Sequence, residues 1–86
     1  ACTVVLKGSG TIITAPSQLA RINTTGNARL ATAGTGDVLA GMIGARLAAG
    51  SDAFSSACES VFRHGQGADA WGFTATMTAK DLIQAI

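Results

Sequence analysis

The segment GTGD, residues 34–37, constrains the fold more than any other part of this 86-residue chain. Its two glycines permit backbone conformations that are closed to other residues, so we expect a tight turn there. The residues that follow place Leu39, Ile43 and Leu47 four positions apart, which predicts a helix with one apolar stripe from Asp37 to about residue 49. The turn therefore delivers a carboxylate to the first turn of a helix.

The residues before this turn read as short strands. TVVLKG (3–8) is apolar and β-branched and ends at a glycine, which is typical of a buried, parallel strand. TIITA (11–15) follows the turn residues Ser9 and Gly10, and ARIN (20–23) gives a third short strand. The stretch 24–36 has no clear period, and we interpret it as an ordered loop of small residues.

Helices are expected to fill the remainder of the chain. Gly50 should end the first helix, and Ser51 should cap a second one that Gly65 closes or breaks. TAKD (78–81) resembles a capping box that opens LIQAI. The expected apolar stripe of the second helix is Phe54, Cys58, Val61 and Phe62. Strands followed by helices indicate an α/β architecture.

Composition bounds the class of protein. Apolar residues make up 48% of the chain and the mean hydropathy is +0.37, which indicates a packed interior within one small domain. The net charge of +1 comes from scattered charges and aromatic residues are few, so a nucleic-acid footprint is not expected. No run reaches the roughly 20 apolar residues of a membrane span. Cys2 and Cys58 lie far apart and are expected to be reduced, buried thiols.

The GTGD segment also carries the strongest chemical signal. A helix N-terminus after a Gly-x-Gly turn exposes backbone N–H groups that can close on a phosphate. A carboxylate beside such a cradle is suited to accept a proton from a hydroxyl that attacks a phosphoryl group. The structural alternative is equally simple, since Asp caps helices and Gly forms turns. The spacing is neither the dinucleotide fingerprint nor a P-loop.

A second segment, VVLKGSGT (4–11), lies where α/β folds place ligand-binding loops, with Lys7 at the end of the strand. Taken alone, that lysine also fits an ordinary solvated surface group. The other polar residues have simple structural explanations. His64 fits a helix end. Loop hydrogen bonding explains Asn23, Asn27 and Arg29 as well as ligand contact does. Trp71 and Phe73 are expected to pack.

Together, VVLKGSGTIITAP, the stretch NTTGNARLATAGTGDVLAGMIGARLAAG and the trailing TAKDLIQAI resemble a known family. They are similar to the C-terminal portion of the ADP/ATP-dependent NAD(P)H-hydrate dehydratases of the ribokinase-like superfamily, over nearly the whole chain. The resemblance implies a three-layer α/β/α sandwich with a mainly parallel central sheet. It also implies a lyase of metabolite repair that restores NADHX or NADPHX to NADH or NADPH, driven by ADP or ATP with Mg²⁺.

The resemblance further assigns roles to residues. Asp37 would be the catalytic base and would face the hydrated nicotinamide, and no residue is assigned to a metal. The nucleotide-binding residues it implies are Lys7, Gly8, Ser9, Gly10, Thr11, Gly34, Thr35 and Gly36.

The family's domain is longer than this chain, so residues 1–86 are expected to be the C-terminal part of one domain and inactive in isolation. The expected partners are the N-terminal remainder of that domain and further copies in a homo-oligomer, in the cytoplasm and without nucleic acid or membrane. A thiazole or hydroxymethylpyrimidine kinase of the same superfamily is one alternative. A non-catalytic nucleotide-binding fragment is the other.

Overall fold

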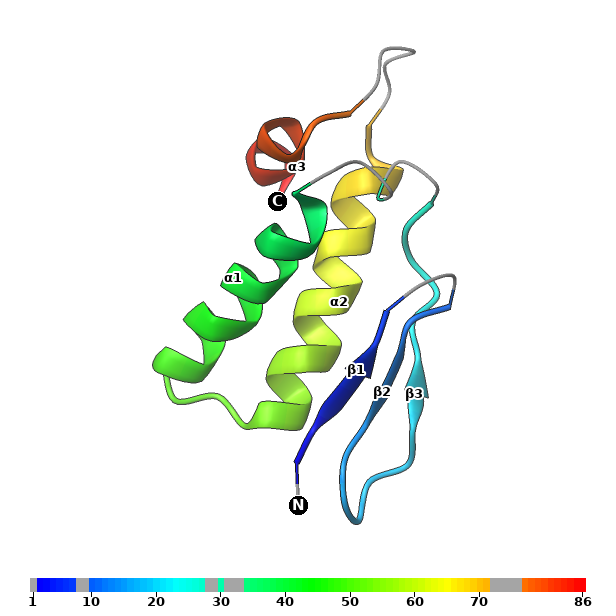
Figure 1. The fold of residues 1–86 in the computed structure, drawn as a ribbon, viewed down its shortest axis with the longest axis vertical. Coiled ribbons are helices and arrows are strands. Elements are labelled where there is room, and N and C mark those ends of the chain that lie inside the picture. Colours follow the sequence, from blue (N-terminus) through cyan, green and yellow to red (C-terminus); the bar gives the residue numbers. More distant parts are fainter. Residues whose placement is uncertain (1, 8–9, 28–29, 31–33, 72–76) are drawn as a thin grey trace.

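The computed structural model describes residues 2–7, 10–27, 30, 34–71 and 77–86 of the chain. A small sheet lies against a layer of helices, and the last helix sits at one end of the first two (Figure 1). This confirms the α/β class and the order of strands before helices. The elements are β1 (Val4–Leu6), β2 (Ile12–Thr14), β3 (Arg21–Ile22), α1 (Thr35–Ala48), α2 (Ala53–Asp69) and α3 (Ala79–Ala85).

The three strands form an antiparallel meander in the order β1-β2-β3, with Val5 opposite Ile13 and Ile13 opposite Arg21. The strand positions were predicted correctly, but the parallel pairing expected for residues 3–8 is wrong for the strands described here. A connection as short as that between β1 and β2 makes a hairpin, whereas a parallel crossover needs about a dozen residues or more.

Burial alternates along β1 and β2, as the pleat requires. Ile13 is 1% exposed and, with Val5, packs on the helices, where Leu39 and Val61 complete the main core. Leu6, one residue further along β1, is 58% exposed on the other face. The prediction that residues 3–8 form a fully buried strand is therefore wrong, since only one face of the sheet is covered by the described residues.

Helix α1 starts two residues before its predicted position, because Gly34 takes a left-handed conformation (φ 90°) and the helix begins at the next residue. Asp37 lies in its first turn as expected. Gly50 ends the helix as predicted: its φ is 94°, and its N–H donates to the Leu47 carbonyl at 3.0 Å. The predicted stripe is buried at Leu39 but 46% exposed at Leu47.

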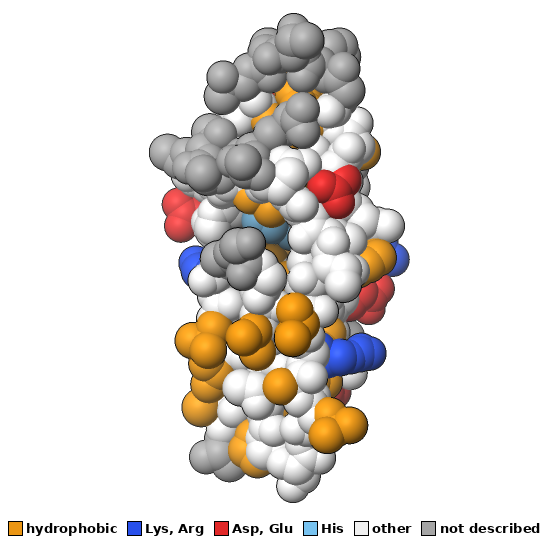
Figure 2. Space-filling view, turned by 90° about the vertical axis from the view of Figure 1, so that its right-hand side faces the viewer, with side chains coloured by type: hydrophobic (Ala, Val, Ile, Leu, Met, Phe, Trp, Pro, Cys, Tyr) orange, Lys and Arg blue, Asp and Glu red, His pale blue; other side chains and the backbone are white. Residues whose placement is uncertain are grey.

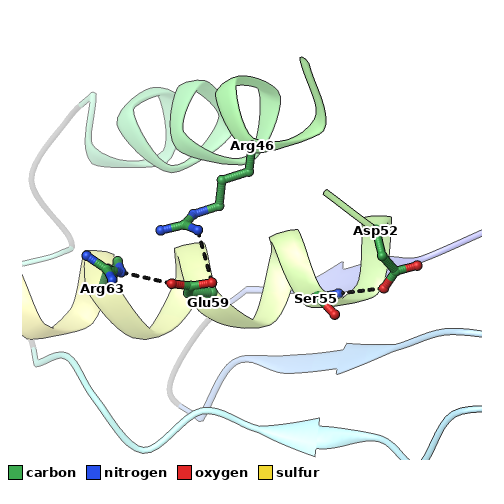
Figure 3. Close-up of polar contacts among 5 residues, drawn as sticks. All are labelled: Arg46, Asp52, Ser55, Glu59 and Arg63. Atoms are coloured by element: carbon green, nitrogen blue, oxygen red, sulfur yellow. Dashed lines mark hydrogen bonds and ion pairs between the residues drawn. The ribbon is translucent and has the colours of Figure 1, made fainter. Parts of the chain in front are cut away.

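Helix α2 differs from the prediction at both ends. Asp52, rather than Ser51, is its N-cap, and the Asp52 carboxylate accepts the Ser55 N–H at 3.0 Å (Figure 3). Gly65 neither closes nor breaks the helix, which continues to Asp69. Of the predicted stripe, Val61 is buried whereas Phe62 is 42% exposed.

Glu59 connects the two long helices at the surface. Its carboxylate pairs with Arg46 of α1 at 2.9 Å and with Arg63 of α2 at 3.2 Å (Figure 3). Exposed pairs of this kind contribute about 0 to 1 kcal/mol each, so the packing of α1 on α2 depends mainly on the core.

Helix α3 opens with the predicted capping box, in which Thr78 and Asp81 bond reciprocally. The hydrogen bonds from the Thr78 backbone and side chain lower the pKa of Asp81. A second core cluster of Ala68, Met77 and Leu82 holds this helix, and the half-buried Trp71 packs against it, which confirms its predicted packing role. Phe73 lies outside the described residues.

The two cysteines are both free, but the prediction that both are buried is wrong. Cys2 is exposed near the start of the chain, and Cys58 is half-buried on α2. Burial raises the pKa of the Cys58 thiol, and the Arg21 guanidinium partly opposes that rise. None of the described helices is long and apolar enough to cross a membrane.

Candidate functional site

A cavity of about 610 Å³ forms where the end of β1, the loop after β3 and the first turn of α1 meet the middle of α2. Its lining combines core residues such as Leu39 and Val61 with polar groups of the loops. Its lining residues are Lys7, Gly10, Thr11, Asn23, Thr25, Gly26, Asn27, Leu30, Thr35, Gly36, Leu39, Val61 and His64.

Lys7 gives this cavity a positively charged end. Its Nζ atom lies 3.2 Å from the position that a Cβ atom would occupy on Gly36, so the ammonium group sits against the backbone of the first turn of α1. Neither of the ion pairs found in the described residues involves Lys7. An unpaired ammonium beside the positive end of a helix is an arrangement suited to anions.

The structure brings together five of the predicted nucleotide-binding residues on this cavity: Lys7, Gly10, Thr11, Thr35 and Gly36. Gly8 and Ser9 lie outside the described residues.

Gly34 and Asp37 line a different hollow, of about 630 Å³, between α1 and α3. Its other walls are mostly apolar and include Val38, Met42 and Ile83. The Asp37 side chain is exposed in the first turn of α1 and takes part in neither of the described ion pairs. The first turn of α1 therefore separates a cavity that contains an ammonium group from a hollow that contains a carboxylate.

Thr35 contributes to the cavity through its backbone. It is 4% exposed, and its hydroxyl donates to the Leu30 carbonyl at 2.5 Å. The side chain is thus committed to holding the entry into α1. What this residue can offer a ligand is the peptide group that it shares with Gly36.

His64 was placed at a helix end by the sequence, and that prediction is wrong. Because α2 continues past Gly65, His64 lies within the helix, is 6% exposed and reaches the cavity. Its Nε2 lies 2.7 Å from the Thr35 carbonyl oxygen. A carbonyl only accepts, so Nε2 carries the proton and donates. The sequence signal that could have revealed this role is the pair His64-Gly65, a polar side chain beside a glycine within an apolar-striped helix.

The protonation state of His64 follows from its surroundings. Burial lowers the pKa of the imidazole, the hydrogen bond to the Thr35 carbonyl partly offsets this, and the Lys7 ammonium lowers the pKa further. Both the burial and the neighbouring positive charge disfavour the imidazolium form. The ring is therefore neutral near pH 7, with its hydrogen on Nε2.

The loop 23–27 also lines the cavity, through all of its residues but Thr24, and is held by α2. Asp69 accepts the Gly26 N–H and the Asn27 side-chain amide, both at 2.9 Å. The Thr25 hydroxyl donates to the Phe62 carbonyl at 2.9 Å. The sequence left open whether the asparagines bind ligand or hold the loop.

Asn23 and Asn27 do hold the loop, and both also line the cavity; Arg29 lies outside the described residues.

Gly65 makes the close packing of this loop possible. A Cβ atom on Gly65 would lie 2.7 Å from the Thr25 carbonyl carbon and 2.8 Å from the Gly26 nitrogen, too close for any side chain. Gly65, from which a helix end was predicted, is the position where the loop packs on the helix.

Within the described ranges, no three His, Cys, Asp or Glu side chains come together as a metal site. The carboxylate nearest the first turn of α1 is the single Asp37, which is too few ligands for a protein-held Mg²⁺.

The family model described as NAD(P)H-hydrate dehydratase matches residues 1–86, the whole chain. This chain belongs to the NAD(P)H-hydrate dehydratase family. The resemblance seen in the sequence is thereby confirmed.

Curated relatives agree with this family. An ADP-dependent (S)-NAD(P)H-hydrate dehydratase from Neisseria meningitidis is 51% identical over 67 residues, covering 78% of this chain and 23% of the relative. A relative with the same name from Bacillus subtilis is 41% identical over 68 residues, covering 79% of this chain and 25% of the relative. A bifunctional NAD(P)H-hydrate repair enzyme, Nnr, from Archaeoglobus fulgidus is 42% identical over 85 residues, covering 96% of this chain and 18% of the relative. The chain thus spans a quarter or less of the length of these three relatives.

Proposed function

We propose that the protein carrying this chain dehydrates NADHX or NADPHX to NADH or NADPH, with ADP or ATP as phosphoryl donor. Family membership supports the reaction class. The observation that carries the role of this chain is the position of the Lys7 ammonium against the Gly36 backbone at the start of α1. An ammonium and free backbone N–H groups are what a terminal phosphate would need.

The proposed reaction uses the two sides of the first turn of α1. Asp37 takes the proton from the ring hydroxyl of the hydrated nicotinamide, and the hydroxyl oxygen attacks the terminal phosphorus of the nucleotide. The bond from that phosphorus to the bridging oxygen breaks, and the shortened nucleotide leaves. The phosphorylated ring then loses phosphate and one ring proton, which restores the double bond. Phosphate leaves far more readily than hydroxide.

The separation of Lys7 from Asp37 supports this division of labour. A carboxylate in contact with the ammonium would pair with it, and each would weaken the other's interaction with substrates. On opposite sides of the turn, the ammonium and backbone N–H groups can hold the phosphoryl oxygens while the carboxylate remains a base. In this proposal Gly34, Thr35 and Gly36 supply backbone to the phosphoryl group, and Gly8, Ser9, Gly10 and Thr11 supply the segment that contacts the nucleotide.

The described residues do not fit a resident Mg²⁺, so none of them is assigned to it. In the proposed reaction any Mg²⁺ would arrive with the nucleotide phosphates and be held by them and by water. It would neutralise phosphate charge.

We also propose that residues 1–86 are the C-terminal part of a single ribokinase-like α/β/α domain and are inactive in isolation. The uncovered face of the sheet supports this: Figure 2 shows hydrophobic side chains gathered on the side of the molecule formed by the strands. Leu19, in the connection between β2 and β3, is 90% exposed, and Ile22 of β3 is 67% exposed. In the proposed domain, the N-terminal remainder covers this face.

Two further expectations stay proposals. The cytoplasm stays the proposed location, because both cysteines are free, as is usual in a reducing compartment. A homo-oligomer is proposed from the family resemblance, and light scattering of the full-length protein tests it.

The test is turnover of NADHX and NADPHX by the full-length protein with ADP or ATP, followed by the return of reduced-nicotinamide absorbance. We expect Asp37→Asn to keep nucleotide affinity within about twofold and to lose at least about 10²-fold in turnover, the usual contribution of a general base. The matched control is Asp52→Asn, an acid at the start of another helix, which should keep full turnover. Full activity of Asp37→Asn would remove Asp37 as the base.

The same assay separates the alternatives. Phosphorylation of a thiazole or hydroxymethylpyrimidine alcohol without NADHX turnover would identify a small-molecule kinase. Nucleotide affinity without turnover of any of these substrates would identify a binding module.

A further inference from the structure

We propose that His64 is a positioning residue that aims the Gly36 N–H at the nucleotide phosphate. This inference rests on the proposed function, because it assigns a role within the same cavity. It begins from one contact: the buried imidazole donates from Nε2 to the Thr35 carbonyl at 2.7 Å. The two residues are 29 positions apart in the sequence, so this bond fixes α1 relative to α2.

The carbonyl of Thr35 does not need this bond to be satisfied. Thr35 is the first residue of α1, and a carbonyl there accepts the N–H of the residue four positions later within the helix. The imidazole therefore uses the second lone pair of an oxygen that is already bonded. A purely structural explanation for placing a buried histidine here is correspondingly weak.

The bond matters because Thr35 C=O and Gly36 N–H belong to the same peptide group. That group is planar and trans, so its C=O and N–H point in opposite directions. Holding the oxygen toward α2 fixes the direction of the Gly36 N–H on the other side. Gly36 is the second residue of α1, and its N–H is one of those with no partner inside the helix.

The Lys7 side chain lies beside the residue that carries this N–H. The ammonium lies against the Gly36 backbone, on the cavity that His64 also lines. A donor bound to the carbonyl also polarises the peptide group and strengthens the N–H on its other side. His64 thus gives the phosphate a second donor of fixed direction beside the ammonium, without touching the ligand itself.

The neutral state of the imidazole suits this role. A neutral ring with hydrogen on Nε2 donates to the carbonyl and adds no second positive charge beside Lys7. The ammonium at the end of β1 is the charged group that acts on the ring, and burial disfavours protonation as well.

Two substitutions in the full-length protein test the proposal. His64→Gln keeps an N–H donor near the place of Nε2, and His64→Leu keeps similar volume without a donor. We expect His64→Leu to weaken ADP binding about tenfold, the effect of losing one hydrogen bond to a charged group, and His64→Gln to restore most of it. The matched control is Ser60→Ala, one turn earlier on α2, since Ser60 is fully buried, has no hydrogen-bond partner among the described residues and does not line this cavity.

The readout specific to this role is the Gly36 amide signal in a proton–nitrogen correlation spectrum. In the parent, His64→Gln and Ser60→Ala proteins, added ADP or inorganic pyrophosphate should move this signal strongly downfield. In His64→Leu the movement should be lost. An unchanged movement and unchanged affinity in folded His64→Leu would overturn the proposal, as would His64→Gln behaving like His64→Leu.

One measurement needs no variant and covers the case in which His64→Leu does not fold. With isotope-labelled histidine, the ring of the parent protein should carry its proton on Nε2, and a proton on Nδ1 alone would overturn the proposal. These readouts do not depend on NADHX turnover. A parent protein that binds ADP through Gly36 but fails to dehydrate NADHX would contradict the proposed function and leave the role of His64 intact.

Discussion

Replacing Gly65 by alanine should destabilise the protein by about 2 kcal/mol, although alanine is the better helix former. An added Cβ atom would meet the Thr25 backbone carbon at 2.7 Å and the Gly26 nitrogen at 2.8 Å. These neighbours are backbone atoms of the loop 23–27, so the loop itself must move away from α2. Adding one carbon atom here acts on a whole wall of the cavity.

The magnitude follows from the bonds that such a movement breaks. The loop is tied to α2 by the hydrogen bonds of Thr25 to Phe62, of Gly26 to Asp69 and of Asn27 to Asp69. At about 1 kcal/mol each, their loss amounts to about 3 kcal/mol. The helix preference of alanine over glycine returns about 1 kcal/mol. The difference is about 2 kcal/mol, a large fraction of the stability of a domain.

Urea unfolding of the full-length protein measures this loss, with Gly44→Ala as the matched control. Gly44 is also within a helix, but outside that helix's own backbone no described residue comes within 4 Å of its added Cβ atom. Gly44→Ala should therefore stabilise by about 0.5 to 1 kcal/mol. Equal unfolding free energies for the two variants would refute the close approach of the loop to Gly65.

Two further predictions follow from the same end of the molecule. Gly36→Ala should fold at least as well as the parent, because the atom that its Cβ meets is the end of the flexible Lys7 side chain, at 3.2 Å. ADP binding measured by calorimetry should nevertheless weaken, because the methyl group displaces the Lys7 ammonium. A gain in both stability and affinity would contradict the proposed site. Because the pKa of His64 is lowered in the folded state, that state binds fewer protons than the unfolded state as the pH falls. The contribution of His64 to stability should therefore be fully present above its ordinary pKa of 6.5 and should fall as the pH drops below that value. In denaturation series from pH 7 downward, His64→Gln should remove this part of the slope, and an identical slope in both proteins would show that the imidazole titrates normally.

Local signals in the sequence predicted local structure well. The left-handed glycine before α1, the stop at Gly50 and the capping box at Thr78 each depend on a few consecutive residues, and all three are found. The wrong predictions for Gly65 and His64 depended on contacts between distant segments. Gly65 looks like a helix end until the loop 23–27 is known to pack on it. Because the helix continues past Gly65, His64 lies within it and lines the cavity.

The candidate site shows the same limit. The family resemblance assigned both the end of β1 and the first turn of α1 to the nucleotide, and Lys7 and Gly36 do line one cavity. Neighbouring residues on a helix point about 100° apart. The sequence does not say which of these directions faces the end of β1, so it could not predict on which side of the turn each group lies. Gly36 therefore borders the cavity of Lys7, whereas Asp37 borders the hollow toward α3.

In the proposed function, that rotation lets one short turn serve two reactants. If the acid stood at position 36, it would meet the Lys7 ammonium, and the resulting ion pair would occupy both the proposed base and the proposed phosphate site. At position 37 the carboxylate is carried to the other side, while the glycine leaves its backbone N–H beside the ammonium. The order Gly36-Asp37 therefore suits the proposed arrangement, in which a phosphate and a base are held at adjacent residues and the imidazole of His64 fixes the peptide group between Thr35 and Gly36.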